Sequence, residues 1–215
     1  MVSEEDVYAL ATRNRLLAAD MFAGLSEAQW TTPSLCAGWS VREVCAHLVP
    51  PPGGHRLLPL VGAVLRFRGD LARLVDVTTR ERAAATPTDQ LVAELQERAG
   101  DRLEAPVVGA LGPMVDTAIH LRDAARPLGL DVGPPPDDWR PVLDFLRTGP
   151  AERGFVGRGR TAGLRLEASD TDWSSGAGDL VRGAAEALAL AVAGRPVAYA
   201  ELEGPGVEVL RSRDR

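Results

Sequence analysis

Apolar side chains recur at helical spacing through most of the first 150 residues. In residues 4–24 they fall on one broad face, made by Val7, Leu10, Ala11, Leu16, Leu17 and Met21. After a connecting loop over residues 25–39, Ser40 and Glu43 have the spacing of a capping box that opens a helix ending near His47. Similar patterns predict further helices over residues 56–76, 86–99, 107–126 and 138–147, separated by proline- and glycine-rich breaks.

The pattern changes after residue 150. Glycines cluster over residues 154–159, and residues 164–168 alternate between apolar and polar side chains, as in a strand. Residues 180–193 form an alanine-rich segment that predicts a helix, and residues 207–211 are typical of a last strand. The sequence therefore predicts an α+β protein, with a helical bundle over residues 1–150 and a small α/β module over residues 151–215.

Composition narrows the possible functions. The 215 residues are 45% hydrophobic and 25% charged, and the net charge of -6 argues against a nucleic-acid-binding surface. All 24 basic residues are arginine, which excludes a lysine Schiff base and a Walker-type lysine. The N-terminus is acidic, no apolar run reaches the ~18 residues of a membrane span, and the two cysteines form no disulfide framework. We expect a cytoplasmic protein that binds neither nucleic acid nor membrane.

Asp116 and His120 are the strongest candidates for chemistry. Residues four apart share one face of a helix, with Cβ atoms about 5–6 Å apart, so a carboxylate and an imidazole can bind one divalent cation. A second histidine, His47, would complete a site with open positions, as in catalytic metal centres. The spacing also fits a surface pair, however, and His47 also fits a helix C-terminus stabilised by the helix dipole. Nothing in the spacing shows that His47, 69 residues away, meets Asp116.

Other candidate residues have simpler structural interpretations. Cys45 lies on the opposite helix face from His47, so a small buried residue is expected, and Cys36 is expected to be a packed cysteine. Ser40 is explained by its capping role, and His55 is expected in an exposed loop. Several arginines are candidate anion contacts without a pattern that chooses among them: Arg66, Arg68, Arg80, Arg82, Arg122, Arg126 and Arg195.

Long stretches of the chain resemble one known family. Residues 25–30 and 33–48 resemble the N-terminal signature of the mycothiol-dependent maleylpyruvate isomerase family, and residues 116–129 resemble its second metal motif. Residues 164–173, 183–188, 194–196 and 202–211 resemble its C-terminal module. The resemblance implies a DinB-like four-helix bundle followed by a small α/β module similar to sterol carrier proteins.

The resemblance also implies a metal centre. The ligands would be His47, Asp116 and His120, and the metal is usually zinc. In the family's type enzyme the acid is glutamate, whereas this chain has aspartate, which is one methylene shorter. Three prolines directly after Val49 are a second departure, at the expected mouth of the pocket.

The implied activity uses mycothiol, a small cysteine-containing thiol, as co-substrate with a small electrophilic substrate. The reaction would be an S-transfer or a cis–trans isomerisation, and no catalytic acid or base is assigned. Arg82, Arg122 and Arg195 are candidates for anion contacts with the thiol or the substrate, and the protein would be a monomer or homodimer. A metal-dependent hydrolase of a small amide or ester and a non-enzymatic ligand-binding protein remain alternatives.

Overall fold

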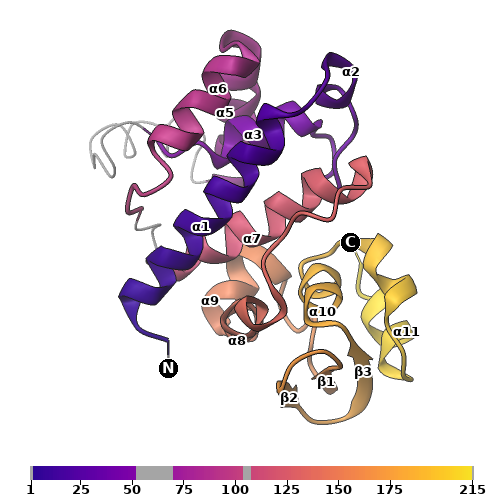
Figure 1. Cartoon of the computed structure of the whole chain (residues 1–215). Coiled ribbons are helices and arrows are strands. Elements are labelled where there is room, and N and C mark those ends of the chain that lie inside the picture. Colours follow the sequence, from indigo (N-terminus) through magenta and orange to yellow (C-terminus); the bar gives the residue numbers. More distant parts are fainter. Residues whose placement is uncertain (1, 52–69, 104–107, 215) are drawn as a thin grey trace. The chain divides into compact units, whose positions relative to one another are not determined.

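The computed structural model describes residues 2–51, 70–103 and 108–214 and shows a mixed fold of many helices and one small sheet (Figure 1). The chain divides into two compact units, Ser3–Gly133 and Pro134–Arg215. The division lies before residue 150, where the sequence pattern changes, because the helix expected over residues 138–147 belongs to the second unit. No helix among the described residues is long and apolar enough to cross a membrane.

The first unit is helical. Its elements are α1 (Glu4–Ala23), α2 (Glu27–Trp30), α3 (Val41–Leu48), α5 (Leu71–Ala85), α6 (Thr88–Glu97), α7 (Leu111–Ala125) and the 3-10 turn η1 (Arg126–Leu128). Helix α1 packs against α7 and α6, while α3 packs against α5, α6 and α7. The core between them contains Phe22, Trp39, Leu91, Leu95 and Leu121. Helix α3, which carries the candidate ligand His47, therefore packs directly against α7, which carries the other two.

Local signals set the ends of the two helices that matter most for the site. The capping box expected at the start of α3 is present, because the Ser40 backbone N–H donates to the Glu43 carboxylate at 2.7 Å. The region after α7 ends at Gly129, whose φ of 68° is left-handed, and the Leu130 N–H donates back to the Ala125 carbonyl at 3.0 Å. His47 thus lies in the last turn of α3, and Asp116 and His120 lie within α7.

The second unit contains the sheet. Its elements are η2 (Pro136–Asp138), α8 (Trp139–Leu146), α9 (Gly149–Ala151), η3 (Glu152–Val156), β1 (Leu164–Ala168), β2 (Ser174–Gly176), β3 (Asp179–Gly183), α10 (Ala185–Val192), η4 (Pro196–Glu201) and α11 (Gly206–Arg211). The strand order is β2-β1-β3, with β2 antiparallel and β3 parallel to β1. Leu164 and Leu166 of β1 and Val181 of β3 are fully buried, and α10 packs against both strands.

Two elements of this unit differ from the sequence prediction. The helix expected over residues 180–193 begins only at Ala185, because Leu180 and Val181 pair with β1 and the Asp170 carboxylate accepts the Ala185 N–H at 2.8 Å. The strand expected over residues 207–211 is helix α11. Its buried residues Val207 and Leu210 are three apart, which is a helical spacing. The alternation Val-Glu-Val in the same segment resembles a strand and led to the wrong prediction.

Two parts of the first unit also differ from the helices and loops that the sequence predicts. The predicted helix over residues 56–76 falls largely on residues 52–69, outside the described residues, as does His55; its described part belongs to α5, which continues to Ala85. The short helix α2 lies within the expected loop over residues 25–39. It brings Trp30 onto Phe22, with ring centroids 5.5 Å apart, so the connection is part of the core.

Gly178 allows the chain to pass close to Gly163 at the start of β3, and its replacement provides a test of stability. Its φ is 119°, and a Cβ there would lie 2.0 Å from the Gly163 carbonyl oxygen, which accepts the Asp179 N–H at the start of β3. We predict that Gly178→Ala lowers the free energy of unfolding by ~2 kcal/mol or more, measured by urea unfolding. Gly149→Ala, in the same unit with no atom within 4 Å of the added Cβ, should leave stability close to wild type. Equal effects of the two changes would contradict this account.

Candidate metal centre

The three candidate ligands meet in space at the contact between α3 and α7. His47 Nε2 lies 3.1 Å from both carboxylate oxygens of Asp116, and His120 Nε2 lies 3.5 Å from Asp116 Oδ1. One donor atom from each of the three residues lies within 4.8 Å of the other two. The side chains are largely buried, with exposed fractions of 16% for His47, 29% for Asp116 and 12% for His120. The long-range meeting that the sequence left open is therefore present.

These separations fit a single divalent cation. Ligand atoms at about 2.0–2.1 Å from a tetrahedral zinc ion are about 3.3 Å apart, close to the two contacts made by Asp116. Two imidazoles and one carboxylate also form a donor set that zinc and iron(II) accept, with positions left for other ligands. Their role as metal ligands stays a prediction, which the geometry supports.

A polar side chain lies next to the Nδ1 atom of each histidine, on the side of the ring that faces away from Asp116. His120 Nδ1 lies 2.9 Å from Asp123 Oδ2, and the Asp123 side chain is completely buried. His47 Nδ1 lies 3.5 Å from the hydroxyl of Thr79 on α5. Metal-binding histidines usually have such a partner on the nitrogen that faces away from the ion, because it fixes the ring's orientation. Both Nε2 atoms are thereby directed toward Asp116.

Trp39 covers one side of the cluster. Its ring centroid lies 5.0 Å from that of His47 and 5.7 Å from that of His120, and it is nearly parallel to the His120 ring, with an interplanar angle of 26°. The indole N–H donates to the Asp76 carboxylate of α5 at 2.7 Å. Since Trp39 is only 7% exposed, it restricts both the rotation of the histidine rings and the access of water.

Charge interactions hold the cluster together. Burial by itself lowers the pKa of His47, but the negative charge of Asp116, and the hydrogen bond to it, outweigh this effect and raise the pKa. For Asp116, burial raises the pKa, yet the positive charges of His47 and His120 outweigh it and hold the pKa well below its usual range. The carboxylate is thus kept ionised.

The candidate anion-binding arginines of the first unit make internal contacts. Arg82 donates to the Val49 carbonyl at 2.9 Å and to the Glu94 carboxylate at 2.6 Å, which joins α5 to the end of α3 and to α6. Arg122 donates to the carbonyls of Leu130 and Val132. Both contacts support the fold around the site, and their proposed anion contacts stay predictions. Arg66 and Arg68 lie outside the described residues.

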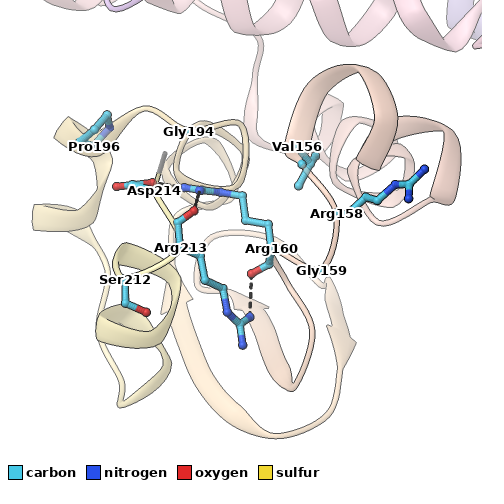
Figure 2. Close-up of a pocket in the computed structure, with 10 residues that line it drawn as sticks. Val156, Arg158, Gly159, Arg160, Gly194, Pro196, Ser212, Arg213 and Asp214 are labelled. Atoms are coloured by element: carbon cyan, nitrogen blue, oxygen red, sulfur yellow. Dashed lines mark hydrogen bonds and ion pairs between the residues drawn. The ribbon is translucent and has the colours of Figure 1, made fainter.

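The second unit contains Arg195 and a separate cavity. Arg195 donates to the Ala193 carbonyl at 2.6 Å. A cavity of about 510 Å³ is lined in part by Arg160 and Arg213, which donate to each other's backbone carbonyls at 3.1 and 2.8 Å (Figure 2). Arg160 is 6% exposed and also contacts Asp214. The side chain of Arg158 points away from this pair in Figure 2. Arg160 therefore joins the segment that follows α11 to the rest of the unit.

Comparisons with known proteins identify the family. The family model for the mycothiol maleylpyruvate isomerase N-terminal domain matches residues 15–165. The chain belongs to this family. Its fold is similar to the crystal structure of a histidine-to-alanine mutant of the mycothiol-dependent maleylpyruvate isomerase, with a TM-score of 0.55, 13% identity, and coverage of 95% of this chain and 93% of that one. A second structure of that isomerase has a TM-score of 0.48, 15% identity and 90% coverage of each chain. No curated protein gives a significant match.

Sequence reasoning missed the residues that support the candidate ligands. Asp123 follows His120 by three residues, so the helical spacing that paired Asp116 with His120 also placed Asp123 on the same side. Trp39 and Thr79 carried no such signal, because their contacts with His47 depend on how α3, α5 and the preceding loop pack. Cys45 is fully buried, as expected, and burial raises the pKa of its thiol to about 12.

The pKa shifts predict a pH dependence for the metal-free protein. The raised pKa of His47 contributes stability that is present below about pH 6.5 and is lost as pH rises through the folded-state pKa. The lowered pKa of Asp116 contributes stability that is present above about pH 4 and is lost as pH falls. After chelator treatment, wild type should therefore exceed Asp116→Asn in free energy of unfolding by more at about pH 5.5 than at about pH 8.5.

Urea unfolding at the two pH values measures this difference. The control is Asp89→Asn, an exposed aspartate on α6, which should shift stability little and to a similar extent at both pH values. A wild-type advantage over Asp116→Asn that is the same at both pH values would show that the His47–Asp116 pair does not titrate as described.

Proposed function

We propose that this protein is a metal-dependent enzyme that uses mycothiol as a nucleophile or carrier on a small electrophilic substrate. The observation that carries the proposal is the convergence of His47, Asp116 and His120 on one point, in a chain of the mycothiol maleylpyruvate isomerase family. Zinc is the proposed metal, because two imidazoles and a carboxylate suit it and leave positions for exogenous ligands.

The residues have distinct roles in this proposal. His47 and His120 would hold the ion through their Nε2 atoms, and Asp116 would hold it through its carboxylate. Asp123 and Thr79 keep the two rings in position, while Trp39 covers one side and restricts water. The bound ion would supply the chemistry that converts the thiol of mycothiol, with an ordinary pKa of about 8.5, into a thiolate at neutral pH.

The fate of the thiolate separates the two possible reactions. Addition of the sulfur to an electrophilic carbon forms a C–S bond, and the substrate's π electrons move to its electron-withdrawing group. If the sulfur leaves after rotation about the former double bond, the net reaction is cis–trans isomerisation. If a proton adds to the carbon skeleton instead, the thioether is the product, and the reaction is S-transfer. We favour S-transfer because the family hosts a broad range of chemistry on one fold.

The finer fold assignment follows from the same argument. We infer that α1, α3, α5 and α7 belong to a DinB-like bundle, because α1 and α3 pack on α7 and α5 packs on α3. The second unit, with a three-stranded sheet packed against α10, is proposed to be the module similar to sterol carrier proteins. Its Arg195, together with Arg82 and Arg122, remains a proposed contact for an anionic group of the thiol or substrate.

Removal of one ligand tests the proposal. Wild-type protein, purified without a metal-affinity column, should contain about one zinc ion per chain and conjugate mycothiol to a generic electrophile. In His120→Ala, metal content and conjugation should both fall to background, because two ligands remain. Elemental analysis and a thiol-consumption assay measure the two properties. The exposed control Asp89→Asn should retain both.

The alternative functions give different results in the same experiment. A metal-dependent hydrolase would lose metal in His120→Ala, but the wild type would not conjugate thiols. A ligand-binding protein without metal chemistry would show no zinc in wild type and no uptake of added zinc. Full conjugation by His120→Ala would exclude the proposed site.

A further inference from the structure

The cavity in the second unit is lined in large part by arginine side chains and glycine backbone. Its volume of about 510 Å³ lies within the roughly 300–1,000 Å³ of pockets that hold a small organic molecule. The lining includes Arg158, Arg160 and Arg213, and its acidic residue is Asp214. Three positive charges and one negative charge give the lining a formal charge of +2, whereas the whole chain has a net charge of -6. This local excess of positive charge favours an anionic ligand.

Arg213 has donor atoms that the protein leaves unused. Its Nη1 atom donates to the carbonyls of Arg160 and Ala162, both at 2.8 Å (Figure 2 shows the first of these contacts). Among the described residues, its Nε and Nη2 atoms make no hydrogen bond, and the side chain forms no ion pair. These two atoms form the edge of a guanidinium that can donate to both oxygens of a carboxylate or phosphate. The contacts of Nη1 hold the group in place, so this free edge is oriented before a ligand binds.

Arg160 supplies a buried donor to the same cavity. The residue is only 6% exposed, and Figure 2 shows its side chain extending toward Asp214. Its Nη1 atom donates to the Arg213 carbonyl at 3.1 Å, and its Nη2 atom contacts the Ala191 carbonyl, the Tyr199 hydroxyl and the Asp214 carboxylate. Its Nε atom is buried and has no hydrogen-bond partner in the described part of the chain. A buried N–H without an acceptor is costly, and an acceptor on a bound ligand would remove that cost.

The glycines of the lining leave room beside these arginines. Gly157, Gly159 and Gly194 have φ angles of 90°, 70° and 82°, which favour glycine because it has no Cβ. A Cβ added at any of the three would meet no atom within 4 Å. Backbone conformation therefore explains the glycines, and the missing side chains keep the space next to the cavity open. A ligand can approach the backbone closely at these positions.

We propose that this cavity binds the oxyanion end of a small organic molecule, a carboxylate or a phosphate, through the free edge of Arg213, with the buried Nε atom of Arg160 as a second donor. Val156 and Pro196 add apolar surface to the lining, which suits a ligand whose remainder is partly apolar. None of the residues belongs to the candidate metal centre, so the site does not depend on the thiol chemistry proposed above. The rival explanation is that the two arginines only fasten the segment after α11, and it predicts no saturable binding.

Titration of the nitrogen-15-labelled wild-type chain, followed by NMR, tests the proposal. The probes are hexanoate and inorganic phosphate, and chloride at matched ionic strength is the control for salt effects. At least one probe should shift the Nε–H signals of Arg160 and Arg213 and the amide signals of Gly157 and Gly159 along a saturable curve, with a Kd of about 1 mM or tighter. Chloride should give no saturable shift. Tighter binding of hexanoate would assign the ligand as a carboxylate, and tighter binding of phosphate would assign it as a phosphate ester.

Variants at Arg213 identify the contact. Arg213→Gln removes the free edge and should weaken binding of the better probe at least ~10-fold, because two charge-assisted hydrogen bonds are lost. Arg213→Lys keeps the charge without the planar fork and should also bind more weakly. Arg140→Gln, which removes an exposed arginine on α8 of the same unit, should bind as wild type does. Unchanged amide signals from β1 and α10 show that each variant is folded. No saturable shift in wild type, an equal response to chloride, or wild-type affinity in folded Arg213→Gln would each overturn the proposal.

Discussion

The contact of one carboxylate with two imidazoles is the interaction on which the site depends. Asp116 lies within α7, His120 lies one turn later, and His47 reaches the same carboxylate from the end of α3. The contact joins two helices whose packing also forms part of the core of the first unit. Any change in the packing of α3 on α7 therefore moves one proposed ligand relative to the other two.

A cluster of this kind needs support from residues that bind nothing themselves. Unfixed imidazole rings would rotate about their side-chain bonds, and each ring would lose its alignment with Asp116. Trp39 packs against both rings and is itself held through Asp76, while Asp123 and Thr79 stand behind the rings. Such supporting residues commonly affect metal affinity by about 10–100-fold. Here they come from α5, α7 and the loop before α3, so the site is a property of the whole unit.

The sequence predicted the local part of this arrangement and could not predict the rest. Residues four apart on one helix must share a face, so the Asp116–His120 pair followed from spacing, and the capping signal at Ser40 placed His47 in a helix. The meeting of His47 with Asp116 came only from resemblance to a family. In the second unit, an alanine-rich stretch concealed β3, and a short alternation near Val207 resembled a strand although the segment is helical. Whether a segment such as β3 becomes a strand depends on its pairing with another strand, and no local sequence pattern shows that pairing.

The charge balance of the cluster is consistent with the proposed cation. Asp116 is ionised in a largely buried environment, where the positive charge of His47 and the hydrogen bond with it help to hold the pKa of the carboxyl below its usual range. A divalent ion at the proposed site would supply a stronger and more directional charge, and both imidazoles would then act as neutral ligands. The buried Asp123 lies behind the ring of His120, with its Oδ2 atom 2.9 Å from Nδ1, and this contact fixes the direction in which Nε2 points.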